Sequence, residues 1–208
     1  DVRYGYDGDW TYAGFHPYGY SSTDQYNRGI NTATVDLRWL SKDSAEDTLN
    51  WLVGLYFLDR DVDLERDYTW LEERFSSQFA LQRRAIYGEL GLPINGLWTL
   101  SIGVRAEIHE ADYEDNAGVR FSPEDDLFGS RLKLERRFAD QQLAYLSFSQ
   151  GYKSGGFNTS GTLDADLRLF DPETLWNVEV GYKSNFLADR GQMRIALFHM
   201  ARADVQIA

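Results

Sequence analysis

"LWTLSIGVRAEIHE", residues 97–110, is the stretch that decides the fold. From Trp98 to Ile108 every second residue is apolar, and the residues between them are polar, charged or glycine. Successive side chains of a β-strand point to opposite faces, so this period of two predicts a strand with one apolar and one polar face. Strands of this kind, placed side by side, form a sheet with two chemically different surfaces.

The same alternation recurs along most of the chain. It predicts eight strands, at residues 29–40, 49–58, 76–90, 97–109, 127–138, 142–153, 174–186 and 192–203. Several are longer than the five or six residues that are usual in globular sheets. A strand that crosses a membrane needs about 9–11 residues. The sequence therefore predicts an all-β chain, an antiparallel meander of about eight long strands that is part of a transmembrane β-barrel.

The connections between the predicted strands alternate in length. "SKDSAED", "GLPING", "ADQ" and "LADRG" are short, whereas segments 59–75, 110–126 and 154–173 are long. Outer-membrane barrels have short periplasmic turns and longer extracellular loops. The three long segments hold 18 acidic and five basic residues, so the negative charge gathers at one rim. We expect this rim to face outward, residues 1–28 to form an outer loop, and residues 29–203 to hold the strands.

Aromatic residues on the apolar side mark both ends of the predicted strands. Barrels carry aromatic girdles where the apolar band meets the lipid headgroups. The expected girdles are Trp39, Trp51, Trp98, Phe138 and Phe186 beside the short turns, and Phe57, Phe128, Tyr152 and Trp176 beside the long loops.

Composition and motifs exclude several function classes. The 33 acidic against 21 basic residues argue against a nucleic-acid partner. The absence of cysteine removes disulfides, thiol nucleophiles and zinc–thiolate sites. No G-x-S-x-G or H-E-x-x-H motif occurs, and "GYKSGGFNTSG" at 151–161 lacks the first glycine of a phosphate-binding loop. We expect neither an enzyme, with no catalytic residues, nor a cofactor.

"DRDVDLERDYTW", from Asp59, begins like a calcium-binding loop with three carboxylates two residues apart. The rest of that motif is missing, because Leu64 stands where an EF-hand needs glycine and Trp70 replaces the final glutamate. We interpret the segment as a solvated acidic loop and predict no metal site. Weak divalent binding at the outer surface is the alternative.

"LSFSQGYKSGGFN", followed by "FDPETLWNVEVGYKSNF" and "IALFHMARADVQIA", resembles the barrel of a TonB-dependent outer-membrane receptor. The resemblance extends back through "ELGLPINGLWTLSIGVRAEIHEADYED", "WLVGLYFLDRDVD" and "VDLRWLSKD" to about residue 30. It implies a barrel of about 22 strands filled by an N-terminal plug, in the outer membrane of a Gram-negative cell. It also implies energised uptake of a scarce ligand such as a ferric siderophore.

The chain departs from the family pattern at both ends, since it shows no plug-like domain, no TonB-contacting box and no final strand that ends in an aromatic residue. We therefore expect an internal fragment of the barrel, without plug and C-terminal strands. The partners implied are outer-membrane lipid and lipopolysaccharide, a small-molecule ligand such as a ferric chelate, and TonB through the missing N-terminal part. A soluble or surface β domain that binds glycans or protein partners is the alternative.

Candidate ligand-binding residues lie on the polar parity and in the loops. Arginine and lysine there can hold an acidic ligand through charge-assisted hydrogen bonds, and loop aromatics offer flat contact surfaces. In the alternative interpretation the polar-face charges only pair with one another or with the plug. The candidates are Arg105, Arg131, Lys133, Lys153, Tyr68, Trp70 and Phe157.

Overall fold

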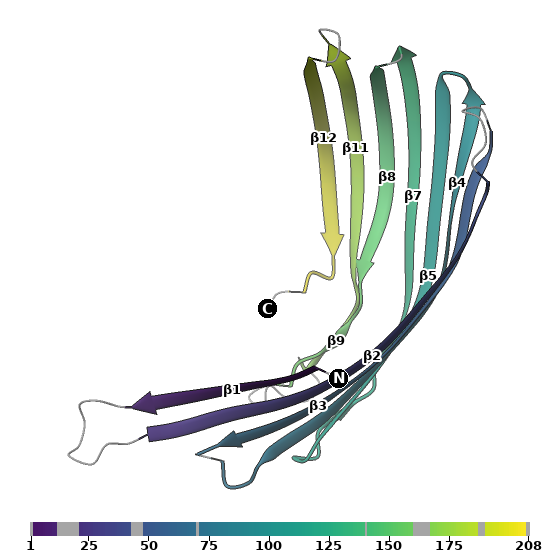
Figure 1. The fold of residues 1–208 in the computed structure, drawn as a ribbon. Helices are drawn as coiled ribbons and strands as arrows, with labels where there is room; N and C mark the ends of the chain where they lie inside the picture. Colours follow the sequence, from purple (N-terminus) through teal and green to yellow (C-terminus); the bar gives the residue numbers. More distant parts are fainter. Residues whose placement is uncertain are drawn as a thin grey trace. The chain divides into compact units, whose positions relative to one another are not determined.

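The computed structural model describes residues 2–11, 21–42, 48–69, 71–139, 141–159, 167–186 and 190–206. Within them, one sheet has the strand order β1-β2-β3-β4-β5-β7-β8-β11-β12, with β6 paired to β5, and β9 pairs with β10 (Figure 1). Among these residues, no helix has the length and hydropathy needed to cross a bilayer. The strands are β1 (Val2–Thr11), β2 (Ser21–Leu40), β3 (Asn50–Tyr68), β4 (Phe75–Asn95), β5 (Trp98–Asp115), β6 (Arg120–Phe121), β7 (Glu124–Ala139), β8 (Gln142–Lys153), β9 (Gly156–Phe157), β10 (Leu169–Phe170), β11 (Glu173–Phe186) and β12 (Gly191–Ala203).

The all-β meander and its eight long strands are confirmed, but the strands extend further than the sequence predicted. β3 continues to Tyr68 and β5 to Asp115, so much of segments 59–75 and 110–126 is strand and not loop. Within the expected outer loop at residues 1–28, the described residues Val2–Thr11 form β1, which pairs with the first half of β2 in regular antiparallel register. The connection at 154–173 contains the short β9–β10 pair.

The strand prediction for β3 ended too early because the second half of this strand is rich in acidic residues. Beyond Phe57 the alternation continues, but the residues that share its face are now Asp59, Asp61, Asp63 and Glu65 in place of tryptophan, valine and leucine. Val62 and Leu64, on the other face, are half-buried. This stretch therefore does not have the geometry of a calcium-binding loop. Carboxylates two residues apart on a strand lie about 6.8 Å apart along one face and do not converge.

The chain divides into two compact units. The first comprises Asp1–Thr34, Leu58–Arg83 and Glu110–Glu124, and the second Val35–Phe57, Arg84–His109 and Asp125–Ala208. In the second unit, β7, β8, β11 and β12 lie side by side (Figure 1). β11 pairs with β8 and β12 without interruption, and a bulge between Arg137 and Ala139 interrupts the β7–β8 pairing.

The apolar face of the second unit is exposed, not packed against another layer. Trp39 is 51% exposed, Val104 49% and Val180 51%. A protein whose surface is entirely in water rarely leaves such a continuous apolar surface uncovered. The same face exposes Val35, Leu37, Trp51, Val53, Leu55, Phe57, Ile86, Ile102, Ile108, Phe128, Leu132, Phe138, Leu146, Phe148, Trp176, Val178, Phe186, Ile195 and Leu197.

The first unit has a small core of its own. Leu81, Ala111, Tyr113 and Phe121 are buried, and the rings of Tyr113 and Phe121 lie 6.4 Å apart. Burial raises the pKa of the Tyr113 phenol to about 12, and its hydroxyl donates to Asp115 Oδ2 at 3.1 Å. The turn that follows β5 closes where Gly118 adopts a φ of 85°, a conformation that glycine tolerates freely.

Tyrosine rings lie over glycines of neighbouring strands at three places in the second unit. A Cβ added to Gly54 would lie 2.2 Å from Tyr87 Cζ, one added to Gly181 would lie 2.3 Å from the Tyr145 ring, and one at Gly129 would lie 3.1 Å from Tyr152 Cε1. Each glycine thus leaves the space that its tyrosine ring occupies. An aromatic ring over a glycine also covers the backbone that the missing side chain would leave bare.

Replacing Gly181 by alanine should therefore displace Tyr145 and its hydrogen bond to Glu179. We expect Gly181→Ala to lower the free energy of unfolding by about 1–3 kcal/mol, as overpacking does in other proteins. Gly151→Ala is the matched control, because nothing lies within 4 Å of its added Cβ. Folding titrations in lipid vesicles would measure both variants, and an equal effect would contradict the close-approach explanation.

A second prediction, about membrane insertion, follows from which residues of β5 lie on the apolar face. Ile102 is exposed on the apolar face, and Ser101 lies on the other face. An arginine at Ile102, near the middle of the apolar row, should cost about 2–4 kcal/mol of folding free energy in a bilayer, whereas arginine at Ser101 should cost far less. A one-residue shift in register would reverse the two results. Vesicle folding titrations in which Ser101→Arg is the more costly variant would refute the assigned facing.

Candidate functional site: the polar face of the sheet

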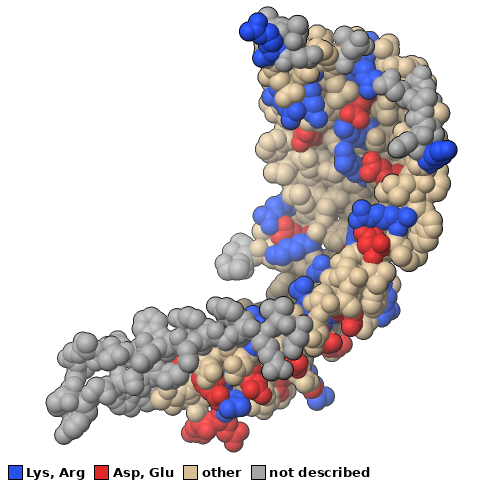
Figure 2. Space-filling model, in the orientation of Figure 1, with Lys and Arg blue, Asp and Glu red and all other residues tan. Residues whose placement is uncertain are grey.

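The candidate site is the polar face of the second unit, by which we mean the face that carries Arg105 and Glu107. The residues that line it alternate along each strand with the residues of the exposed apolar row. They come from β2, β3, β4, β5, β7, β8 and β11. Basic and acidic side chains lie next to one another across the second unit in Figure 2. The face is therefore charged but locally balanced.

Arg105 lies at the centre of one cluster. Its guanidinium pairs with Glu107, a nearly buried carboxylate, and its Nε donates to the Tyr152 hydroxyl at 3.0 Å. The Tyr152 hydroxyl in turn donates to Glu107 Oε2 at 3.2 Å. The rings of Tyr56 and Tyr87 lie 5.1 and 5.6 Å from the guanidinium, within cation–π range. Side chains from four strands, β3, β4, β5 and β8, thus meet around one cation.

Tyr152 is a correction to the sequence-based assignment, which placed it on the apolar face as a girdle residue. The structure turns its ring to the polar face, where Gly129 leaves room for it and where Arg105 and Glu107 satisfy its hydroxyl. A phenol hydroxyl finds hydrogen-bond partners among these charges that hydrocarbon does not offer. Alternation alone cannot detect such a local departure near the end of a strand.

A neighbouring cluster joins β2 to β4. Asp36 pairs with Arg38, and the Tyr87 hydroxyl donates to Asp36 Oδ1 at 2.5 Å while it accepts from Arg38 Nε at 2.9 Å. Tyr87 also lies beside Arg105, so the two clusters share this ring. Asp36, Arg38, Tyr56 and Tyr87 were not among the predicted site residues, although they share the parity of the polar positions.

A third cluster surrounds Tyr145 on β8. Lys133 Nζ pairs with Glu135 at 2.7 Å, and both Lys133 and Lys183 lie 5.4 Å from the centre of the Tyr145 ring. The Tyr145 hydroxyl donates to Glu179. Of the predicted ligand-binding cations, Arg105 and Lys133 therefore already have carboxylate partners, as the alternative interpretation of mutual pairing expected.

The two other predicted cations are exposed. Arg131 lies on β7 opposite Ser149 of β8, and Lys153 ends β8 opposite Glu173 of β11. Glu173 is nearly buried, and it accepts from Arg202 and from the backbone N–H of Gln206 at 3.1 Å. Lys153 thus lies at a charged junction where β8, β11 and the end of β12 meet.

Phe157 lies in β9, near the start of the connection at residues 154–172. It pairs with Leu169 in the β9–β10 ladder, next to Gly156 and Phe170. Gly155 donates its backbone N–H to Asp125 Oδ2 at 2.9 Å, and a Cβ at Gly155 would lie 2.6 Å from the Phe170 carbonyl oxygen. Close packing of β10, not a left-handed turn, therefore requires this glycine.

Tyr68 belongs to a cluster in the first unit. Arg66 forms a two-pronged ion pair with Asp24, with both N···O distances 2.7 Å, and its guanidinium lies 4.9 Å from the Tyr68 ring and 5.0 Å from the Tyr26 ring. The hydrogen bonds from Arg66 hold the pKa of the Asp24 carboxyl below its ordinary value. Trp70, the remaining predicted site residue, lies outside the described residues.

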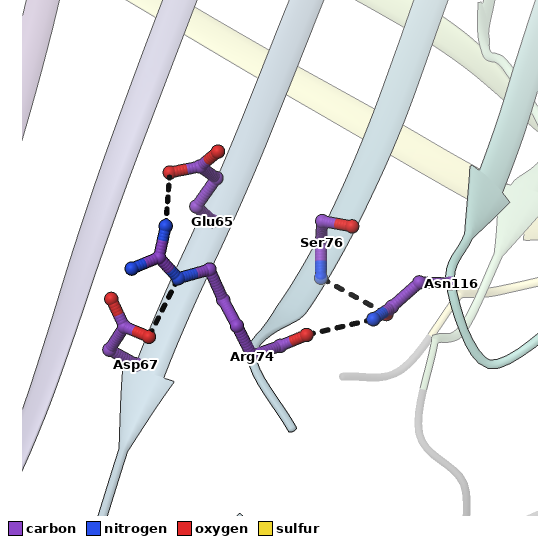
Figure 3. A network of polar contacts seen from close by, with 5 residues as sticks. All are labelled: Glu65, Asp67, Arg74, Ser76 and Asn116. Atoms are coloured by element: carbon purple, nitrogen blue, oxygen red, sulfur yellow. Dashed lines mark hydrogen bonds and ion pairs between the residues drawn. The ribbon is translucent and has the colours of Figure 1, made fainter.

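The connection between β3 and β4 is fastened by polar contacts of Arg74 and Asn116 (Figure 3). Arg74 bonds to Asp67 at 2.8 Å and to Glu65 at 3.5 Å, while Asn116 donates to the Arg74 carbonyl at 2.8 Å and accepts from the Ser76 N–H at 3.0 Å. Two of the acids on β3 are thus held by an arginine. No group of three metal-ligating side chains forms within the described parts of the chain.

Comparison with solved structures gives the same fold. The crystal structure of the ferric yersiniabactin uptake receptor FyuA from Yersinia pestis matches with a TM-score of 0.69 at 21% identity, over 90% of this chain and 30% of that one. The alcaligin outer-membrane receptor FauA from Bordetella pertussis matches at 0.62 and 15% identity, over 88% and 30%. The siderophore receptor PiuA from Acinetobacter baumannii matches at 0.66 and 15%, over 86% and 32%.

The chain thus spans about a third of the length of these receptors. The family model described as TonB dependent receptor-like, β-barrel, matches residues 1–208. Members of this family are transport receptors of the Gram-negative outer membrane and not enzymes, which assigns the apolar face to lipid and the polar face to the barrel interior. The chain belongs to the β-barrel family of TonB-dependent receptors.

Proposed function

We propose that this chain forms part of the wall of a receptor that takes up a scarce ligand such as a ferric siderophore, with energy relayed by TonB. The main observation in support is that one face of the sheet is charged and rich in tyrosine, while the opposite face is apolar and suited to lipid. A membrane barrel with a polar interior of this kind offers a solute a path through the bilayer. The receptors FyuA, FauA and PiuA, which share the fold, support the choice of ligand class.

The ligand contacts we propose are of two kinds. Arg131 and Lys153 are exposed cations, suited to carboxylate, catecholate or hydroxamate oxygens through charge-assisted hydrogen bonds. Arg105 and Lys133 are paired with Glu107 and Glu135, so a ligand oxygen would have to compete with those carboxylates. We further propose that Tyr68, Trp70 and Phe157 contact the ligand at the outer rim. TonB would act through a part of the receptor outside this chain.

The orientation follows from the two ends of the strands. The turn between β4 and β5 is short, whereas at the other end β3 and β5 continue past the apolar row with exposed acidic residues on one face. We propose that the extended end faces outward, beside the lipopolysaccharide headgroups.

Binding of ferric chelates to the purified receptor, in its natural length, tests this function. Titrations with a panel of ferric catecholate, hydroxamate and carboxylate chelates, followed by tryptophan fluorescence, should identify one chelate class with a dissociation constant of about 1 μM or lower. Arg131→Gln and Lys153→Gln should each weaken binding of that chelate by about tenfold, a loss of about 1.4 kcal/mol.

Arg136→Gln is the matched control. Arg136 also lies on β7, but it contacts the rings of Trp98 and Phe138 near the short-turn end, at 5.2 and 4.7 Å. It should bind the chelate as the unaltered receptor does. If no ferric chelate binds, and loss of the gene leaves growth under iron limitation unchanged, the assigned ligand class is wrong.

A further inference from the structure

Charge on the polar face is not balanced near the short-turn end of the second unit. Arg137 of β7 pairs with Leu143 of β8, which pairs with Lys183 of β11. Lys183 in turn pairs with Arg194 of β12. Directly paired residues of an antiparallel sheet share a face, here the one that also carries Glu135, two residues before Arg137. Arg137, Lys183 and Arg194 therefore form one row across four strands, which we call the basic row.

The cations of the basic row are exposed and lack a counter-charge. Within the described residues, no ion pair joins any of them to a carboxylate. The nearest acids along the same strands are engaged elsewhere, because Glu135 pairs with Lys133 and Glu179 accepts from the Tyr145 hydroxyl. The Lys183 ammonium lies 5.4 Å from the centre of the Tyr145 ring, a cation–π contact that brings no negative charge. Figure 2 shows basic side chains gathered toward this end of the second unit.

Without an anion, the basic row destabilises the sheet. Lys183 and Arg194 are directly opposite one another, where Cβ atoms lie about 4.5–5.5 Å apart and like charges weaken the pairing. Arg137 lies two strand spacings from Lys183, about 9.6 Å, on the other side of Leu143. Side chains as long as these can bring all three charged groups together above Leu143. An oxyanion at that point would relieve the repulsion and accept charge-assisted hydrogen bonds from each cation.

We propose that the basic row is a binding site for small polyvalent carboxylates, with one carboxylate group for each of its three cations. The row lies near the start of β8, whereas Lys153 ends that strand, so the site is separate from the outer contacts proposed above. In the orientation proposed above, it belongs to the periplasmic opening of the barrel. There it would hold an anionic chelate that has passed the paired clusters. This role rests on the proposed function, whereas the anion site itself does not.

Calorimetric titration with tricarballylate, an iron-free tricarboxylate, tests the site in the purified receptor of natural length. All samples carry Arg131→Gln and Lys153→Gln, so that the outer cations do not bind the probe, and sodium chloride keeps the ionic strength constant. This receptor should bind the probe with a dissociation constant of about 1 mM or lower. Adding Arg194→Gln should weaken binding about tenfold, and Arg194→Lys, which keeps the charge, should restore most of it.

Thermal unfolding gives a readout that a merely structural role of Arg194 would not produce. Without the probe, Arg194→Gln should unfold at a higher temperature than the receptor with Arg194, because it removes the repulsion from Lys183. The probe should raise the unfolding temperature of the receptor with Arg194 and have little effect on the variant. Arg136→Gln is the matched control, because it removes a neighbouring positive charge whose side chain contacts Trp98 and Phe138. It should bind the probe normally.

Absence of tricarballylate binding would overturn the proposal. It would mean that other groups already neutralise the basic row, such as Asp140 and Asp189 in the adjacent turns, which lie outside the described residues. Equal affinities of Arg194→Gln and Arg136→Gln for the probe would also overturn it, since the binding would then not depend on the row.

Uptake of radiolabelled ferric chelate by cells tests the role of the site separately. Arg194→Gln in the otherwise unaltered receptor should leave binding of the chelate unchanged and slow its uptake by about tenfold. Unchanged uptake would refute the role at the periplasmic opening. If the receptor binds no ferric chelate, the proposed function is wrong, but the tricarballylate titration still decides whether the anion site exists.

Discussion

The structure depends on one constraint: each long strand has one face in contact with lipid and the other in contact with water. In hydrocarbon, backbone N–H and C=O groups have no water to bond, so they must pair within the sheet. Once the ladder is formed, side chains can only alternate between its faces. Val104 must then suit lipid while Arg105, one residue later, suits a wet interior. The clusters on the polar face are one response to this requirement.

The polar face meets the requirement by balancing charge locally. Arg105 with Glu107, Lys133 with Glu135 and Asp36 with Arg38 each join residues two apart on one strand, which are neighbours on the same face. Tyrosines then link the pairs across strands, and glycines opposite Tyr87 and Tyr145 give their rings space. Such pairs contribute little stability where they are exposed. Their greater effect is to leave few uncompensated charges behind a thin wall next to lipid.

Much of this arrangement was predictable from the period of two, and the exceptions have physical causes. The eight strands and the lipid-facing row were predicted because Trp98 to Ile108 and similar stretches alternate without interruption. The outer half of β3 was missed because Asp59 to Asp67 resemble a loop in composition, although Val62 and Leu64 keep the alternation. The partners of Arg105 were not predictable, since contacts with Tyr56 and Tyr152 depend on register between strands that are distant in the sequence.

The pairing of charges also affects how the inner wall of the barrel would bind a ligand during transport. A ligand held too strongly at one point cannot move on, so a conducting path needs sites that are favourable enough to enter and weak enough to leave. Because Glu107 and Glu135 already compensate Arg105 and Lys133, an anionic ligand gains little by displacing either carboxylate. Exposed Arg131 and Lys153 lack that competition within their own strands. On the proposed function, selective binding therefore belongs to the exposed cations, and the paired clusters form a wall along which the ligand passes.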